Sequence, residues 1–134
     1  MNALTRRPRT LAEVASRVTA DEQAFDPALR EFLDAFYANP ETRQAAIDDP
    51  PPHLDALRDA YLAAVGEHLA RCHDLEIPNW AETRGLDLER PFFAGGLQSL
   101  KARLFVESPT AFRRRMLFVS KDALFRPRAI PPTA

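Results

Sequence analysis

Proline limits the possible folds of this chain more than any other residue, because twelve prolines and only four glycines are distributed over 134 residues. Proline fixes φ and lacks a backbone N–H, so it starts or ends helices and is excluded from central strands. Between the prolines, apolar residues recur three or four positions apart, which is typical of amphipathic helices, and strand signal is almost absent. We therefore expect an all-α fold, an irregular bundle of four to six helices with a basic, proline-terminated C-terminal segment.

Helix-capping residues predict where the first two helices begin. Thr10 and Glu13 have the spacing of a capping box, in which each side chain accepts a hydrogen bond from the other residue's backbone N–H. A helix to about residue 18 should follow. Asp26-Pro27 predicts a second start, with aspartate as the cap and proline in the first turn. That helix should end near residues 37–38, because the residue before a proline avoids the α region.

The longest helix is expected at about residues 52–73, after a short helix at 39–47 and an extended break of three prolines at 50–52. Its apolar residues are three or four apart and should face the core: Leu54, Leu57, Tyr61, Ala64, Val65, Leu69 and Cys72. The charged residues between them are expected on the solvent side: Arg58, Asp59, Glu67 and Arg71. Gly66 weakens a helix by about 1 kcal/mol relative to alanine, which is either tolerated or required by a close helix crossing.

Residues 74–96 are expected to form a packed connection. Prolines and glycines interrupt any long element there, while Trp80, Phe92 and Phe93 supply large apolar anchors. A further helix is expected at about residues 96–106.

The C-terminal segment begins at Ser108-Pro109, which repeats the pattern of a capping residue followed by proline. One or two helical turns are expected at 111–115, followed by a short apolar run with β-forming residues at 116–119. Another cap and turn are expected at 120–125, and the prolines at 127, 131 and 132 predict an extended end.

Charge is distributed unevenly along the chain. Residues 19–60 contain ten acidic residues and three arginines, whereas residues 100–134 contain eight basic residues and only two acidic ones. We expect a basic N-terminal arm at 1–9, a helical domain at 10–106 and a basic C-terminal segment at 107–134. Either the opposite charges fold the ends onto the body, or the basic segment meets an acidic or phosphate-bearing partner.

No sequence motif predicts catalysis. His68 and Cys72 are four residues apart on a helix, but a zinc site needs three or four ligands and no second Cys/His pair exists. Cys72 lies on the expected apolar face, where a small thiol packs well. The chain has no nucleophile elbow, and Gly95-Gly96 matches neither the Walker nor the dinucleotide-binding pattern. We therefore expect no enzyme activity, no metal and no cofactor.

The composition also favours a cytoplasmic protein. The net charge is only −1, and no apolar run approaches the roughly 18–20 residues that a membrane span needs. A single cysteine fits a reducing compartment, and no secretory signal follows the polar N-terminus. A homodimer stays open, because the aromatic-rich helix faces could be buried within one chain or between two.

The three adjacent arginines Arg113, Arg114 and Arg115 are the strongest local signal. Neighbouring side chains on a helix point about 100° apart, so some of this charge must project into solvent or onto a partner. Arginine presents a fork of N–H donors that suits carboxylates and phosphates. Three interpretations stay open: a solvated or self-docked face, a contact with a protein partner, or a contact with nucleic acid.

Residues 107–124, ESPTAFRRRMLFVSKDAL, resemble the closing segment of a group of small bacterial antitoxin-like proteins encoded beside nucleotidyltransferase-like toxins. The tails of that group have a pattern close to E-S-P-x-x-F-R-R-x-x-x-F-V-S-x-x-A-L. The chain departs from the group after Leu124, where it continues FRPR. The resemblance implies a protein-interaction module that inhibits such a toxin, with the partner-binding residues Phe112, Arg113, Arg114, Arg115, Phe118, Lys121, Leu124 and Arg126.

Electrostatics supplies a physical reason for such a partner. Nucleotidyltransferases hold magnesium with clustered carboxylates, so a basic tail complements their pocket and its aromatic residues would serve as buried anchors. The alternative is a nucleic-acid-binding regulator, in which Arg6, Arg7 and Arg9 join the tail arginines on DNA phosphates.

Overall fold

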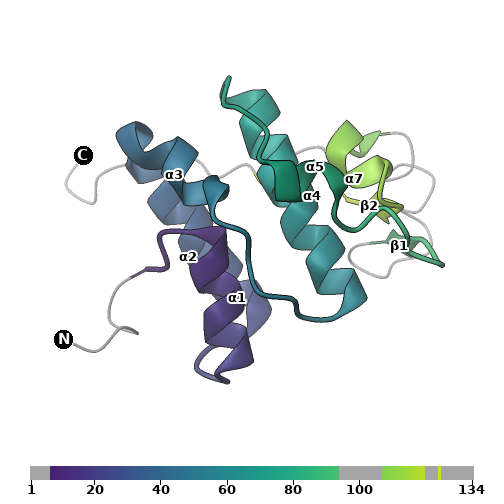
Figure 1. The fold of residues 1–134 in the computed structure, drawn as a ribbon, viewed down its shortest axis with the longest axis horizontal. Coiled ribbons are helices and arrows are strands. Elements are labelled where there is room, and N and C mark those ends of the chain that lie inside the picture. Colours follow the sequence, from purple (N-terminus) through teal and green to yellow (C-terminus); the bar gives the residue numbers. More distant parts are fainter. Residues whose placement is uncertain (1–6, 94–106, 120–123, 125–134) are drawn as a thin grey trace. The chain divides into compact units, whose positions relative to one another are not determined.

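The computed structural model describes residues 7–93, 107–119 and 124, and within them the chain is mostly helical (Figure 1). The all-α expectation is confirmed, with one small exception, a parallel pair of two-residue strands. The chain divides into two compact units, residues 1–54 with 125–134 and residues 55–124. The predicted helix at 96–106, the cap at 120–123 and the basic residues Arg6, Lys121 and Arg126 lie outside the described residues.

The first unit contains α1 (Leu11–Thr19), α2 (Phe25–Ala38), the 3₁₀ helix η2 (Pro40–Thr42) and α3 (Arg43–Asp48). The Thr10 cap is confirmed, because its hydroxyl accepts a hydrogen bond from the Glu13 N–H at 3.0 Å. The Glu13 carboxylate reaches one residue further back than predicted, to the Arg9 N–H. Both α1 and α3 bury apolar faces, and α1 packs along α2 (Figure 1).

The start of α2 is capped differently from the prediction, whereas its end at Ala38 confirms the prediction. Ala24, not Asp26, is the N-cap residue, so Asp26 lies in the first turn, where a carboxylate favours the positive end of the helix dipole. At the other end, the Arg43 guanidinium donates to the Phe36 and Tyr37 carbonyls at 3.2 and 3.3 Å. The carbonyls of the last turn have few partners within a helix, and the Phe36 carbonyl also accepts from the Asn39 N–H at 3.4 Å.

In the second unit the long helix α4 (Ala56–Cys72) begins later than the predicted residue 52. Asp55 is its cap and accepts a hydrogen bond from the Arg58 N–H at 2.8 Å. This bond is the main reason that the pKa of Asp55 is lowered. The expected solvent side is partly wrong: Leu57 and Cys72 are exposed, whereas Glu67 is completely buried.

Two glycines allow close contacts with α4. A methyl group at Gly66 would lie 3.2 Å from Ala81 Cβ, on the short helix α5 (Asn79–Thr83), so the close helix crossing is the reason for this glycine. Gly85 has φ of +80°, and a methyl group there would lie 2.4 Å from Ala60 Cα. Only glycine combines a favourable positive φ with the absence of a side chain that would collide with Ala60.

The C-terminal residues of this unit pack on α4. The short helix α7 (Thr110–Arg113) lies against α4, and β2 (Leu117–Phe118) pairs in parallel with β1 (Phe92–Phe93) (Figure 1). The apolar run at 116–119 therefore does contain a strand. The expected Ser108 cap is wrong, because the buried Ser108 hydroxyl bonds to the backbone N–H and carbonyl of Val119.

Candidate functional site

The three adjacent arginines point to different surroundings. Arg113 and Arg114 are exposed, whereas Arg115 is completely buried and is among the largest fully enclosed side chains in the described residues. Arg115 follows α7, where the backbone turns through Met116 at a φ of +61° before β2 begins. The run is thus divided between the interior of the unit and its surface.

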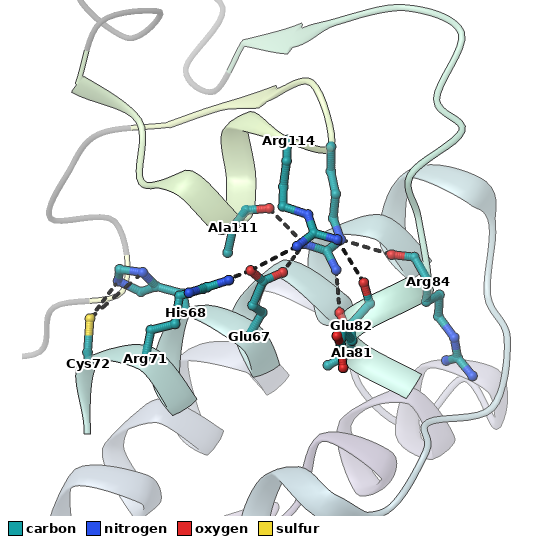
Figure 2. Close-up of polar contacts among 10 residues, drawn as sticks. Glu67, His68, Arg71, Cys72, Ala81, Glu82, Arg84, Ala111 and Arg114 are labelled. Atoms are coloured by element: carbon teal, nitrogen blue, oxygen red, sulfur yellow. Dashed lines mark hydrogen bonds and ion pairs between the residues drawn. The ribbon is translucent and has the colours of Figure 1, made fainter. Parts of the chain in front are cut away.

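Arg115 is held by hydrogen bonds from all three of its guanidinium nitrogens. Nη1 donates to Glu67 Oε1 at 2.7 Å and to the Ala111 carbonyl at 2.8 Å. Nε donates to the Arg84 carbonyl at 2.8 Å, and Nη2 donates to the Ala81 carbonyl. These contacts tie α7, α4 and the α5 region together around one charge (Figure 2).

Glu67 is the centre of the cluster, because its carboxylate contacts three guanidiniums (Figure 2). Besides Arg115, Arg71 Nε lies 2.8 Å and Arg114 Nη1 lies 3.3 Å from Glu67 Oε2. We call Glu67, Arg71, Arg114 and Arg115 the Glu67 cluster. The expectation that Glu67 faces solvent is wrong, because a buried ionised carboxylate requires several donors and the C-terminal arginines supply two of them.

Electrostatics keeps the cluster ionised. Burial alone raises the pKa of Glu67, but hydrogen bonds from Arg115 and Arg71, and the charges of Arg115 and Arg114, outweigh it and lower that pKa. Burial lowers the pKa of Arg115, and its bond to Glu67 opposes that change. One carboxylate therefore faces three guanidiniums, which leaves an excess of positive charge.

The two exposed arginines are also partly fixed by the backbone. Arg113 donates from Nε and Nη2 to the Ser108 carbonyl, at 3.3 and 2.8 Å. Arg114 donates from Nη2 to the Glu82 carbonyl at 2.8 Å. Their guanidiniums are thus oriented at the surface rather than freely mobile.

The predicted aromatic and aliphatic anchors are part of the fold. Phe112 is completely buried, with its ring centroid 5.2 Å from Tyr61 and 6.0 Å from His68. The Phe118 ring stacks on the Phe93 ring, with their centroids 4.9 Å apart. Both Phe118 and Leu124 are buried. Phe112, Phe118, Leu124 and Arg115 are therefore enclosed in the fold, and their role as contacts for a partner stays a prediction.

His68 and Cys72 lie together at the end of α4. The Cys72 sulfur is 3.5 Å from His68 Nε2, and the thiol is exposed, contrary to the expected buried position. Burial, followed by the charge of His73, lowers the pKa of His68, and burial raises the pKa of Cys72. This pair is a neutral imidazole beside a protonated thiol at neutral pH, not an activated nucleophile.

Sequence reasoning missed Glu67 and Arg71 as members of the cluster. One signal in the sequence points to Glu67: it follows Gly66, and a glycine within a helix is compatible with a close helix crossing. A residue beside a crossing glycine is itself close to the crossing helix. Arg71 is four residues from Glu67, a spacing at which a helix pairs opposite charges, whereas Arg114 and Arg115 lie 47 and 48 residues away, which local periodicity does not reveal.

No protein-family model matches the chain, and comparisons with curated proteins and with solved structures find no significant match. Among residues 7–93, 107–119 and 124, no three His, Cys, Asp or Glu side chains form a group that could hold a metal ion. None of the helices in this same part of the chain is both long and apolar enough to cross a membrane.

Proposed function

We propose that this chain is a protein-interaction module, an antitoxin-like inhibitor that binds a nucleotidyltransferase-type toxin through the surface arginines of its C-terminal segment. The observation that carries the proposal is the division of the arginine run. Arg115 is anchored in the interior. The two consecutive residues before it, Arg113 and Arg114, are exposed at the surface.

Anchoring favours binding because it reduces the entropy that association removes. The backbone carbonyls of Ser108 and Glu82 already orient the two exposed guanidiniums. A side chain that is oriented before binding loses less rotamer freedom on contact. Positive charge at fixed positions also speeds encounter with an acidic surface and sets the register of the complex.

The chemistry of the suggested partner fits such a surface. An enzyme that holds magnesium with clustered carboxylates presents an acidic pocket rim, and guanidiniums form strong bidentate bonds with carboxylates. Lys121 and Arg126, which lie outside the described residues, add two positive charges to the same segment of the sequence. The resemblance of residues 107–124 to antitoxin-like tails is what names this class of partner.

The test is a tagged pull-down from the native host, treated with nuclease and read by mass spectrometry. We expect a stoichiometric nucleotidyltransferase-like protein with the wild-type chain and its loss with Arg113→Glu. Arg90→Glu is the matched control, because Arg90 is an exposed arginine of the same unit outside the cluster, and it should retain the partner. Arg114 is left unchanged, since reversing its charge would place a carboxylate beside Glu67.

Recovery of the chain without a protein partner would contradict the proposal. The nucleic-acid-binding regulator would be favoured if the chain recovers only nucleic acid before nuclease treatment. It should then bind duplex DNA near about 50 mM salt, with an affinity that falls steeply as salt rises. Circular dichroism of both variants checks that the helices are intact.

A further inference from the structure

Two partly exposed guanidiniums share one oxygen of a buried carboxylate. Arg71 Nε and Arg114 Nη1 lie 2.8 and 3.3 Å from Glu67 Oε2, so these two nitrogens are no more than about 6 Å apart. The Arg71 side chain is 49% exposed and the Arg114 side chain is 33% exposed, whereas Glu67 is 0% exposed. The two arginines approach the carboxylate from different elements, α4 and the residue after α7 (Figure 2).

Both guanidiniums have N–H donors to spare. Arg71 uses only Nε, so its Nη1 and Nη2 groups have no acceptor in the part of the chain that the structure describes. Arg114 uses Nη1 and Nη2 for one acceptor each, which leaves Nε and the second hydrogens of both. An arginine has five N–H donors in a fixed plane, and most of those on this pair are available.

The charges at the cluster do not balance. Three guanidiniums meet one carboxylate, which gives a local charge of +2. Because Glu67 is completely buried, an approaching anion meets the guanidiniums and not the carboxylate. The cluster is therefore complementary to a second negatively charged group.

We propose that Arg71 and Arg114 form a binding site for a phosphate group. A phosphate monoester carries a charge of about −1.5 to −2 at neutral pH and three strong acceptor oxygens, which match the excess charge and the spare donors. Because Arg71 and Arg114 meet at one oxygen of Glu67, their guanidiniums are close enough for one phosphate group to accept charge-assisted hydrogen bonds of about 2.8 Å from both. A single carboxylate matches less well, since it carries only half of the missing charge.

Glu67 is a positioning residue at this site. It holds Arg71 and Arg114 together through Oε2, and its other oxygen is occupied by Arg115. Two guanidiniums brought this close would repel each other without it. Replacing Glu67 should therefore weaken phosphate binding through the geometry of the arginines rather than through any direct contact.

The test is an NMR titration of the full chain with inorganic phosphate, with chloride exchanged to hold ionic strength constant. The Nε–Hε signals of Arg71 and Arg114 are expected to shift in a saturable way, and that of Arg90 is not. Arg71→Gln should weaken the affinity at least tenfold, and Arg71→Lys should recover part of it because the charge is restored without the planar fork. Arg90→Gln is the control.

Adding a nucleoside monophosphate under the same conditions distinguishes the source of the phosphate group. Tighter binding of the nucleotide indicates a nucleotide ligand, and equal binding indicates recognition of the phosphate alone. The proposal is overturned if phosphate shifts the Arg71 and Arg114 signals no more than it shifts the Arg90 signal. It is also overturned if Arg71→Gln, with its helices intact, binds phosphate as the wild-type chain does.

Arg114 belongs to both proposed surfaces, so phosphate binding and capture of a protein are separated through Arg71, which lies on α4, and Arg113, which donates to the Ser108 carbonyl. Arg71→Gln should lose phosphate and keep the protein partner, and Arg113→Glu should do the reverse. The failure of one experiment therefore does not decide the other.

Discussion

Glu67 Oε1 lies 2.7 Å from Arg115 Nη1, and neither side chain is exposed although 48 residues separate them in sequence. A buried ion pair is not by itself stabilising, because both charges lose hydration. Replacing only one residue of the pair is costly, however, because the charge of the other stays buried without that counter-charge. The C-terminal segment is therefore connected to α4 by a contact that tolerates loss of both partners better than loss of one.

A double-mutant cycle should show this coupling. We expect Arg115→Met and Glu67→Met each to lower the free energy of unfolding by about 3–5 kcal/mol. Glu67→Met leaves the buried Arg115 charge without its carboxylate, and Arg115→Met leaves Glu67 with only the partly exposed Arg71 and Arg114. The double variant should be more stable than the sum of the two losses predicts. Urea denaturation followed by circular dichroism measures all four free energies, and strictly additive losses would show that the two residues are not coupled.

The cluster should also make stability depend on pH. The pKa of Glu67 is lower in the folded chain than its ordinary value of 4.5. Its contribution is therefore complete above the pH at which an unfolded glutamate ionises, and it is lost as pH falls through the folded pKa. Urea midpoints measured from about pH 7 down to about pH 3 should fall for the wild-type chain.

Glu67→Gln should have a weaker acid dependence than the wild-type chain. The acid dependence of Asp55→Asn is the comparison for that of Glu67→Gln. The pKa of Asp55 is also lowered, but Asp55 is exposed at the start of α4, whereas Glu67 is buried. If the curves of Glu67→Gln and the wild-type chain run parallel below pH 5, the assignment of this acid dependence to Glu67 is wrong.

The two glycines that contact neighbouring elements should respond differently to alanine. Gly85→Ala combines a positive φ with a methyl group 2.4 Å from Ala60 Cα, and should lower the unfolding free energy by about 2 kcal/mol or more. Gly66→Ala gains helix propensity of about 1 kcal/mol and meets Ala81 and Trp80 at 3.2–3.3 Å, so its net change should be smaller. Thermal unfolding of both variants compares them, and a larger loss for Gly66→Ala would contradict these contacts.

Cys72 should be accessible but not activated. Its thiol is exposed, so a disulfide reagent such as DTNB should modify it in the folded chain. Its pKa is raised by burial, so the reaction at pH 7 should be slower than that of free cysteine. Reaction only after unfolding in urea would restore the sequence-based expectation of a buried thiol, and faster reaction than free cysteine would contradict the pKa.

Local signals in the sequence predicted local structure well. The cap at Thr10, the end of α2 before Pro40 and the extended run that contains β2 each depend on a few neighbouring residues. At Gly66 the sequence leaves two explanations open, and the contact with Ala81 favours the close crossing. The start of α2 was misplaced because Asp26 suits both the cap and the first turn of a helix.

Features that depend on distant partners were not predictable. Helical periodicity assigns one face of a helix to solvent, but α5 and α7 both pack on α4, so Glu67 is enclosed. The Ser108 hydroxyl was expected to cap a helix and instead bonds to Val119, eleven residues away. The positions of Arg114 and Arg115 depend on Glu67, which no local pattern connects to them.

The most direct test of this account is the free energy of unfolding of Arg113→Gln, Arg114→Gln and Arg115→Gln, measured side by side in urea. We predict a loss of about 3 kcal/mol or more for Arg115→Gln, because Glu67 loses its buried partner. Arg113→Gln should stay within about 1 kcal/mol of the wild-type chain, since Arg113 is exposed. Similar small changes for all three variants would contradict the division of the arginine run between the interior and the surface.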